Sequence, residues 1–209
     1  MKGRIAEQYD SLYSVRNNVY DDELPHKATM YIPQYLLSGM VLDVGAGEGQ
    51  NALYLAKKGF VVTAIDLSQV GLNKIKAAAE IERLHLKTCV ADIEHYQHQD
   101  KFAAHLFSFV LHHLNTENAI RVLETAKRQT LPGGIHVIAT FANQGGLYQR
   151  AKKSGRFYPS LKVLEDVYSD WQILEKDVFE RASLAKDKQG NHLINETILL
   201  VARKIQKTP

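Results

Sequence analysis

The feature that most constrains the fold of this chain is a glycine-rich loop that joins an apolar run to a helical pattern. The loop follows Met40–Val44, has glycine at positions 45, 47 and 49, and precedes Gln50–Lys58, whose apolar residues have helical spacing. Small residues let the backbone approach a ligand closely, and a helix start offers free N–H groups. The pattern therefore predicts a ligand site at the junction of a buried strand and a helix.

The alternation of short apolar runs and helical patterns continues to about residue 141. The further predicted strands are Phe60–Ile65, Leu86–Ala91, Ala104–Phe109 and Ile135–Phe141, and the further predicted helices are Gln69–Leu84, with Ser68 as its N-cap, and Thr116–Gln129. Leu131-Pro132-Gly133-Gly134 is predicted to be a turn. Strands separated by helices of this length indicate βαβ units, a parallel sheet and helices on both faces.

The end of the chain has a different pattern. Trp171–Glu180 and Leu193–Arg203 are both extended, with no helix between them, so they predict an antiparallel hairpin that closes the sheet. We expect one α/β domain over residues 1–209. Within it, residues 1–38 are expected to form a helical N-terminal cover, and residues 142–170 an insertion on the substrate side; plain surface packing explains these two segments equally well.

Composition and charge narrow the function classes. The chain has 26 Lys and Arg against 23 Asp and Glu and no long basic block, so a nucleic-acid partner is not predicted. Cys89 is the only cysteine, and its apolar surroundings predict a small buried hydrophobe. His95 and His98 are three apart with His105 nearby, but a further ligand is lacking and no metal site is predicted. With no signal peptide and no apolar run of membrane-spanning length, we expect a cytoplasmic monomer or homodimer without membrane contact.

Acidic residues around the glycine loop distinguish between possible ligands. Asp43 precedes the loop and Glu48 lies inside it. Two carboxylates would repel a pyrophosphate by a few kcal/mol within ~5 Å, whereas a ligand with an ammonium and a sulfonium group would be attracted. No Lys-Ser/Thr follows the loop, which excludes the nucleotide-hydrolase version. The charges favour S-adenosylmethionine over NAD.

Two more acids follow the next two predicted strands. Asp66 ends the second strand, where a carboxylate can accept hydrogen bonds from ribose hydroxyls. Asp92 ends the third strand, where it can accept from an adenine amino group, and Leu67 and Ile93 are placed to pack on the adenine ring. Helix capping or a solvated strand end is the alternative for each acid alone. Three acids after three successive strands favour a shared ligand.

Together these segments resemble the class I S-adenosylmethionine-dependent methyltransferase family over about residues 38–141. The resemblance rests on Val41–Gly49, Ala64–Ser68, Ala91–Ile93, Ser108–Leu114 and Leu131–Gly134. It implies a Rossmann-like, mostly parallel sheet of seven strands with a reversed last strand, and S-adenosylmethionine as cofactor. By the same resemblance Gly45, Ala46, Gly47, Phe107 and Ser108 would line the methionine end. Asp66 would hold the ribose, and Asp92 with Ile93 the adenine.

The end of the chain and the segment after the glycine loop are similar to the tellurite-resistance methyltransferases, which methylate tellurium and selenium oxyanions. The similar segments are Asn51–Ala56, Trp171–Leu174, Lys188–His192 and Leu200–Lys204. This sequence departs from that subfamily at Leu184-Ala185, where the subfamily has a His-Arg pair, and at Glu196, where it has arginine. The departures remove groups that would face an anionic substrate.

Methyl transfer depends mainly on alignment of acceptor and methyl group, so no single catalytic residue is required. His112 and His113 follow the fourth predicted strand and are the candidates for a base or hydrogen-bond partner. The alternative is that they cap the following segment or lie under a loop. Aromatic groups near the sulfonium could come from Tyr9, Tyr13 and Tyr20, and charges that attract an anionic acceptor from Arg150, Lys152, Lys153 and Arg156.

The predicted function is S-adenosylmethionine-dependent methylation of a small-molecule acceptor, with tellurite or selenite as one candidate type. Two alternatives stay open. One is a methyltransferase for a protein or RNA target. The other is a non-catalytic nucleotide-binding protein, or a NAD-binding oxidoreductase, on the same Rossmann-like fold.

Overall fold

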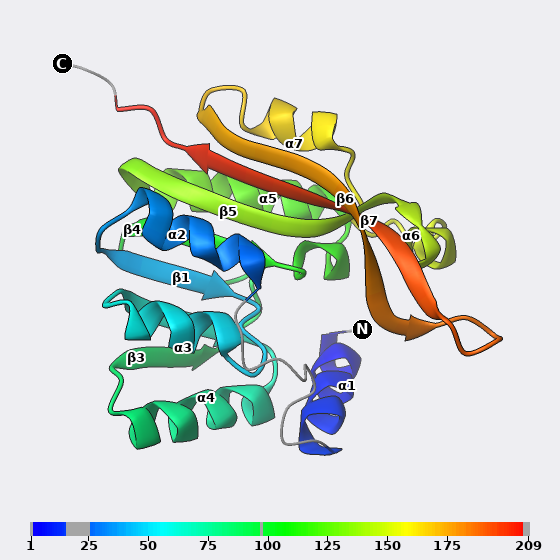
Figure 1. Cartoon of the computed structure of the whole chain (residues 1–209), viewed down its shortest axis with the longest axis horizontal. Helices are drawn as coiled ribbons and strands as arrows, with labels where there is room; N and C mark the ends of the chain where they lie inside the picture. Colours follow the sequence, from blue (N-terminus) through cyan, green and yellow to red (C-terminus); the bar gives the residue numbers. More distant parts are fainter. Residues whose placement is uncertain (1, 16–25, 97, 207–209) are drawn as a thin grey trace. The chain divides into compact units, whose positions relative to one another are not determined.

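The computed structural model describes residues 2–15, 26–96 and 98–206. The chain divides into two compact units, residues 1–106 and residues 107–209. Seven strands form one sheet in the order β3-β2-β1-β4-β5-β7-β6 (Figure 1). This order, in which an antiparallel pair of strands follows the parallel ones, confirms the predicted α/β fold with a Rossmann-like sheet.

The first unit holds the glycine loop and the parallel strands around it. Its elements are α1 (Lys2–Val15), the 3₁₀ helix η1 (Lys27–Met30), α2 (Tyr31–Tyr35), β1 (Met40–Val44), α3 (Gln50–Lys57), β2 (Val61–Asp66), α4 (Gln69–Glu82), β3 (Leu86–Val90) and most of β4 (Phe102–Ser108). β1 pairs in parallel with β2, and β2 pairs in parallel with β3. α3 and α4 contact each other and both pack on β2 (Figure 1).

Local sequence explains these elements well. β1 and β2 are buried along almost their whole length, as continuous apolar runs are when helices cover a parallel sheet. In α4 the residues Leu72, Ile75 and Ala79 form one buried face at helical spacing. The Ser68 hydroxyl accepts a hydrogen bond from the Gly71 N–H, which confirms Ser68 as the N-cap of α4.

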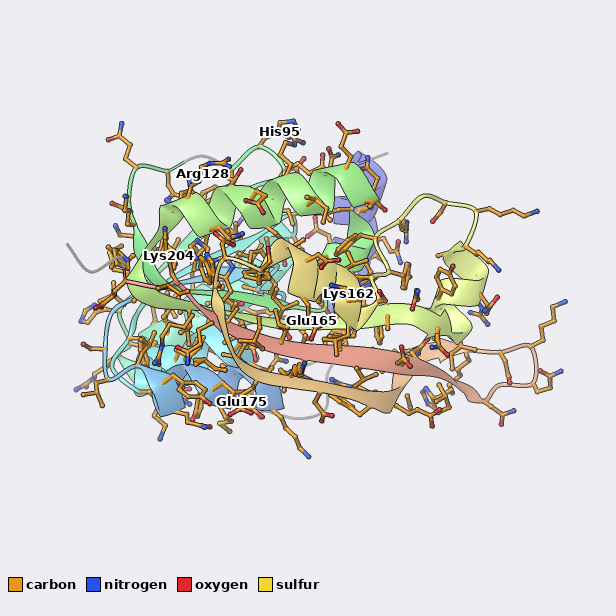
Figure 2. The ribbon with its side chains drawn as sticks, turned by 90° about the horizontal axis from the view of Figure 1, so that it is seen from above. His95, Arg128, Lys162, Glu165, Glu175 and Lys204 are labelled. Atoms are coloured by element: carbon orange, nitrogen blue, oxygen red, sulfur yellow. The ribbon has the colours of Figure 1, made fainter. Side chains whose placement is uncertain are left out.

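The second unit contains the long antiparallel strands. Its elements are the 3₁₀ helix η2 (Leu111–His113), α5 (Thr116–Gln129), β5 (Thr130–Gly145), α6 (Gly146–Ala151), α7 (Leu161–Val167), β6 (Gln172–Lys186) and β7 (His192–Arg203). β7 pairs antiparallel with both β5 and β6, which confirms the predicted C-terminal hairpin. Figure 2 shows α5 and α7 beside strands β5, β6 and β7, and Lys127 of α5 binds the carbonyl of Val167 at the end of α7.

Two predictions for local structure are wrong. Leu131–Gly134 is not a turn but lies within β5, because its backbone pairs with the residue after β7: the Gly133 N–H donates to the Lys204 carbonyl at 3.0 Å, and the Lys204 N–H donates to the Gly134 carbonyl at 2.9 Å. Cys89 is exposed rather than buried, because β3 is an edge strand of the sheet. A smaller difference is that β4 begins at Phe102, two residues before the predicted start.

The two segments without a regular pattern contain helices. Residues 2–35 contain α1, η1 and α2 within the described ranges, and a covering role for this segment stays a prediction. Residues 142–170 include the end of β5 together with α6 and α7. Of the helices in the described ranges, none combines the length and the apolar character that a membrane span requires.

Candidate functional site

The glycine loop of the first unit follows β1 and is tied to the end of β2. The N–H groups of Gly45 and Ala46 both donate to the Ile65 carbonyl, at 2.9 and 3.0 Å. Gly47 and Gly49 have φ of +56° and +94°, and a Cβ at Gly49 would lie 2.5 Å from Cγ1 of Ile75. Both positions therefore require glycine, for backbone conformation and for close packing against α4.

Asp66 connects this loop to the start of α4. Its Oδ2 accepts from the Gly47 N–H at 2.9 Å, and its Oδ1 accepts from the Ser68 N–H at 2.8 Å. Burial raises the pKa of Asp66, and the N–H groups of Ser68, Gly47 and Leu67 partly oppose this rise. The two carboxylate oxygens together offer about four lone-pair sites, and three backbone N–H groups act on them here. Asp66 therefore keeps acceptor capacity of the kind that ribose hydroxyls need.

Asp43 is the buried carboxyl at the end of β1. It has no exposed surface, and neither oxygen makes a hydrogen bond of normal geometry with a described residue. Burial raises the pKa of Asp43 to about 7, the nearby charge of Asp66 adds to the rise, and the backbone of Ala52 opposes it. A buried carboxyl without a strong partner becomes ionised more easily when a cation binds nearby.

Glu48 does not play the electrostatic role that the sequence suggested. Its side chain is fully buried and forms an ion pair with Lys74 of α4, with Nζ and Oε1 2.6 Å apart. The charge of Glu48 is therefore matched within the protein, because α4 packs across the loop. Of the two predicted charges, Asp43 is the one whose oxygens have no hydrogen-bond partner of normal geometry among the described residues, and its attraction of a cationic ligand stays a prediction.

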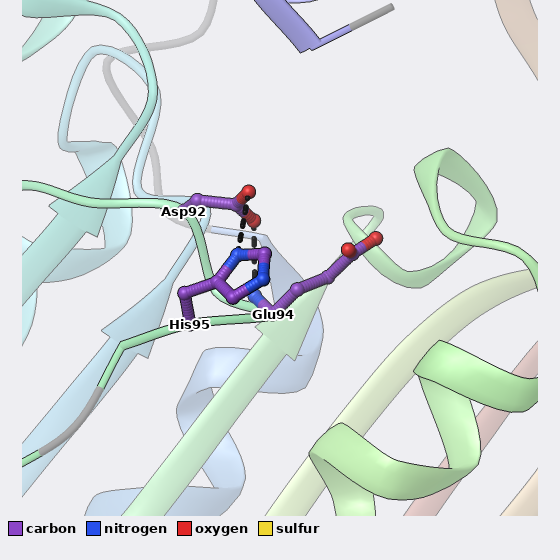
Figure 3. A group of neighbouring side chains, drawn as sticks. All are labelled: Asp92, Glu94 and His95. Atoms are coloured by element: carbon purple, nitrogen blue, oxygen red, sulfur yellow. Dashed lines mark hydrogen bonds and ion pairs between the residues drawn. The ribbon is translucent and has the colours of Figure 1, made fainter.

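Asp92 follows β3 and is already hydrogen-bonded. Its Oδ1 accepts from the Glu94 N–H at 3.0 Å, and its Oδ2 lies 3.2 Å from Nδ1 of His95 (Figure 3). Ligand atoms of Asp92, Glu94 and His95 lie within 4.8 Å of one another. Ile93 and, after β2, Leu67 are half-buried apolar side chains. Contact of Asp92, Ile93 and Leu67 with adenine stays a prediction.

Two further histidines of the first unit, His98 and His105, lie against an aromatic ring. His98 and His105 both contact the ring of Phe102, with centroid distances of 4.7 and 5.3 Å. His105 is buried in β4. Nδ1 of His98 also lies 2.8 Å from the carbonyl oxygen of Asp100.

In the second unit, His112 and His113 lie in η2 among aromatic side chains. Their rings are 4.1 Å apart, and the His112 ring is 5.1 Å from Phe141 and 5.9 Å from Tyr158. The set also includes Tyr148, 5.8 Å from Tyr158, and Phe109, 4.7 Å from Phe141. We call these six residues the histidine–aromatic cluster.

Burial keeps both histidines uncharged. It lowers the pKa of His112 well below its ordinary value, with added effects of His113 and Arg156, and it lowers the pKa of His113 to about 4, with an added effect of Arg156. The alternative role as helix caps is not supported, because the side chain of Asn115 caps α5 by accepting from the Asn118 N–H. The pair can accept a proton or a hydrogen bond at neutral pH.

The remaining predicted cofactor residues lie at the end of β4. Phe107 is fully buried, with its ring 5.8 Å from that of His136, so its side chain belongs to the core of the second unit. Ser108 is half-buried. Their place beside the methionine end of a cofactor stays a prediction.

Several residues of potential importance escaped sequence reasoning. Asp10 of α1 binds Ser68, 58 positions away, and the guanidinium carbon of Arg181 lies 4.8 Å from the ring centroid of Phe109, which has a φ of +53°. Neither contact has a local sequence signal.

The predicted tyrosines and basic residues lie as follows. The ring centroids of Tyr13 and Tyr9 are 5.5 Å apart in α1, whereas Tyr20 lies outside the described residues. Arg150 donates to the carbonyl of Lys186.

The residues of the first unit fit S-adenosylmethionine. A glycine loop that only small residues can form, a carboxylate with remaining acceptor capacity and a buried carboxyl without a strong partner suit a cationic nucleoside. With the strand order described above, the fold is that of class I S-adenosylmethionine-dependent methyltransferases. The chain belongs to the family described as "Tellurite resistance protein TehB", whose family model matches residues 12–199.

Individual proteins agree with this family. The chain is 27% identical over 164 residues to a Haemophilus influenzae protein named "Probable S-adenosyl-L-methionine-dependent methyltransferase TehB", and the match covers 78% of this chain and 57% of that protein. The chain thus spans little more than half the length of this relative. The crystal structure of TehB from Haemophilus influenzae has a TM-score of 0.77 at 23% identity, covering 94% of this chain and 67% of that one.

A third similar protein has a known small-molecule ligand. It is the 1,6-didemethyltoxoflavin-N1-methyltransferase of Burkholderia thailandensis, solved with 1,6-didemethyltoxoflavin and S-adenosylhomocysteine bound. Its TM-score is 0.71 at 20% identity, and the match covers 97% of this chain and 88% of that one. At this identity the likeness shows the fold alone.

Proposed function

We propose that this chain binds S-adenosylmethionine and transfers its methyl group to a small-molecule acceptor. The observation that carries the proposal is the position of Asp66, whose two oxygens accept from the N–H groups of Gly47 and Ser68. This arrangement fixes a carboxylate between the glycine loop and the start of α4. The family match to TehB and the names of its relatives support the same cofactor.

In this proposal the first unit supplies most of the residues that hold the cofactor. Asp66 accepts from the ribose hydroxyls, Asp92 accepts from the adenine amino group, and Leu67 and Ile93 pack on the adenine ring. The backbone of Gly45, Ala46 and Gly47 lies against the methionine end, with Phe107 and Ser108 as the further predicted neighbours. The cofactor supplies a methyl group on a sulfonium, which is already activated for displacement. The ionised form of Asp43 stabilises positive charge near the loop.

The acceptor side of the proposal rests on the histidine–aromatic cluster. Uncharged His112 and His113 accept a hydrogen bond or a proton from the acceptor, but their low pKa makes them weak bases. Weak bases suit an acceptor with an acidic proton. Aromatic rings favour a planar partner, because ring faces and edges attract one another. We therefore propose a planar heteroaromatic acceptor with an ionisable hydroxyl or ring N–H.

Tellurite or selenite is the acceptor that the family name suggests, but the structure offers few positive charges that would bind such an oxyanion. Leu184 is exposed, and Glu196 lies opposite Glu180 in the β6–β7 ladder, so these positions carry no positive charge for an oxyanion. Positive charge at the cluster comes from Arg181 beside Phe109 and from Arg156, whose charge lowers the pKa of both histidines. An oxyanion therefore remains the comparison acceptor for the experiment.

Calorimetry with S-adenosylmethionine, S-adenosylhomocysteine and NAD tests the cofactor. We expect the first two to bind and NAD not to bind. Asp66→Ala should weaken S-adenosylmethionine binding by about 1.5–3 kcal/mol, as expected for lost hydrogen bonds to a charged group. Asp100→Ala, which removes an exposed carboxylate from the same unit, is the matched control. Binding of NAD alone, or an Asp66→Ala variant with unchanged affinity, overturns the proposal.

Turnover tests the acceptor. Heteroaromatic hydroxyl and N–H compounds, tellurite and selenite should be compared for production of S-adenosylhomocysteine, and we expect the heteroaromatic class to be faster. With the best acceptor, alanine at both His112 and His113 should lower kcat by about 100-fold if proton transfer is part of the reaction. His192→Ala, at an exposed histidine, is the control. An unchanged kcat with intact cofactor binding removes the histidines from the proposal, and faster oxyanion turnover removes the acceptor class.

A further inference from the structure

The N-terminal helix α1 is fastened to the first turn of α4 by Asp10. Its Oδ1 accepts from the Ser68 hydroxyl at 2.5 Å and from the Val70 N–H at 3.2 Å. The Ser68 oxygen in turn accepts from the Gly71 N–H at 3.0 Å. Asp10 therefore places a negative charge at the positive end of α4 and completes the cap of that helix. α1 lies beside α4 in Figure 1.

Tyr13, three residues further along α1, covers the glycine loop. It is only 3% exposed. A Cβ added at Gly47 would lie 2.9 Å from the Tyr13 hydroxyl, and a Cβ added at Gly71 would lie 3.2 Å from Cδ2 of the same ring. The absence of side chains at both glycines makes room for Tyr13. One helical turn of α1 thus contacts α4 through Asp10 and the loop through Tyr13.

These contacts form a closed set with the carboxylate that we propose for the ribose. Asp10 binds Ser68, the Ser68 N–H binds Asp66, Asp66 binds the Gly47 N–H, and Tyr13 lies against Gly47. Asp10 also acts on Asp66 electrostatically, because its charge raises the pKa of Asp66. A movement of α1 would therefore change the surroundings of Asp66 and of the loop together.

We infer that Asp10 and Tyr13 are positioning residues of the cofactor site, and that cofactor affinity depends on the docking of α1 through Asp10. The inference rests on the proposed function, since it takes Asp66 and the glycine loop as the cofactor-binding residues. It gives α1 a role in cofactor binding, which a helix that only packs on α4 would not have. Asp10 acts through Ser68 and Asp66, and Tyr13 acts at Gly47.

The test compares two variants of α1, each of which removes one negative charge. Asp10→Asn should weaken the binding of S-adenosylhomocysteine by about tenfold in calorimetry, because the hydrogen bonds of a charged group are weakened. Glu7→Gln, at an exposed position one turn earlier, should leave the affinity unchanged. With the best acceptor, Asp10→Asn should raise KM for S-adenosylmethionine and leave kcat within about twofold, because α1 acts on cofactor binding. Tyr13→Phe keeps the ring and should weaken binding by about threefold.

Hydrogen exchange gives a reading that does not depend on turnover. Saturating S-adenosylhomocysteine should increase the protection of the backbone amides of residues 5–15 in the unaltered chain, and less so in Asp10→Asn. The inference is wrong if Asp10→Asn binds S-adenosylhomocysteine as tightly as Glu7→Gln while Asp66→Ala still binds weakly; the proposed function then stands. If Asp66→Ala also binds normally, the proposed cofactor site is wrong and the inference falls with it.

Discussion

The end of β1 in the first unit and η2 in the second unit both bury titratable groups, and they respond to burial in opposite ways. Burial favours the uncharged form of any group. At Asp43 it raises the pKa to about 7, and at His113 it lowers the pKa to about 4. The carboxyl is thus close to its ionisation point at neutral pH, whereas the histidine is far from it.

The difference separates two kinds of chemistry. A carboxyl poised near pH 7 ionises when a cation binds close to it, so the first unit can adapt its charge to a ligand. Histidines that stay uncharged across the physiological range provide a lone pair and no charge. The protonation of Asp43 and that of His113 are linked to folding with opposite signs. The pH dependence of the unfolding free energy can therefore measure the difference between the two sites.

The largest expected effect concerns Asp43→Asn. The ordinary pKa of 3.8 applies to the unfolded chain, and about 7 applies to the folded protein. Between these values the folded protein holds a proton that the unfolded chain has lost, so stability decreases as pH rises through this window. The contribution of Asp43 is about 4 kcal/mol. The variant should lack this decrease in urea unfolding series from pH 4.5 to 7.5.

Asp100→Asn serves as the control for an exposed acid and should follow the unaltered protein at each pH. The reading is the difference in unfolding free energy between variant and unaltered protein at each pH, because other groups titrate in the same window. A difference that does not change with pH would mean that Asp43 is ionised throughout.

His113 should contribute a pH dependence of stability that has the opposite sign to that of Asp43 and is smaller, and His113→Gln should remove it. Below its ordinary pKa of 6.5 the unfolded chain takes up a proton that the folded protein refuses until about pH 4. Stability from this histidine is fully present above pH 6.5 and is lost as pH falls to about 4, by about 3 kcal/mol. The glutamine variant should lose less stability on acidification, measured by urea unfolding, whereas His192→Gln should not. If the unaltered protein, His113→Gln and His192→Gln lose equal stability on acidification, the pKa of His113 is the same in the folded and unfolded states.

Gly71→Ala probes the close packing of α4 against the glycine loop of the first unit. A Cβ at this position would lie 2.4 Å from the Gly47 carbonyl oxygen, so α4 or the loop must shift. Overpacking of this kind should cost about 2 kcal/mol of unfolding free energy and weaken S-adenosylhomocysteine binding. Gly3→Ala in α1 is the control, since a Cβ there meets nothing within 4 Å. A Gly71→Ala protein as stable as Gly3→Ala would mean that the loop is not held against α4.

The smallest effect on stability is expected for Arg181→Met in the second unit. The variant keeps an unbranched side chain and removes the cation–π contact to Phe109, which at an exposed position should cost about 0.5–1 kcal/mol. Its kcat/KM should fall more for an anionic acceptor than for a neutral one. Lys188→Met, in the exposed turn between β6 and β7, is the control. It should change neither the stability nor the ratio of kcat/KM for the anionic acceptor to kcat/KM for the neutral one. Equal losses for both acceptors would exclude a role of Arg181 in charge recognition.

Much of the fold could be predicted because it depends on local patterns. Met40–Val44 and Thr116–Gln129 have the predicted bounds, since apolar runs and helical spacing are read directly from neighbouring residues. Ser68 is the N-cap of α4 as predicted. The glycine loop was recognisable because left-handed backbone and close packing both select glycine.

The tertiary structure decided what depends on distant neighbours. Cys89 is exposed because β3 lies at the sheet edge, and Glu48 is neutralised because α4 brings Lys74 to it. The pKa of Asp43 follows from complete burial, which no local pattern gives. The contact between Asp10 and Ser68 joins residues 58 positions apart. Sequence alone thus determined the sheet, its helices and the glycine loop, whereas burial and long-range pairing decided which charges of that loop remain available to a ligand.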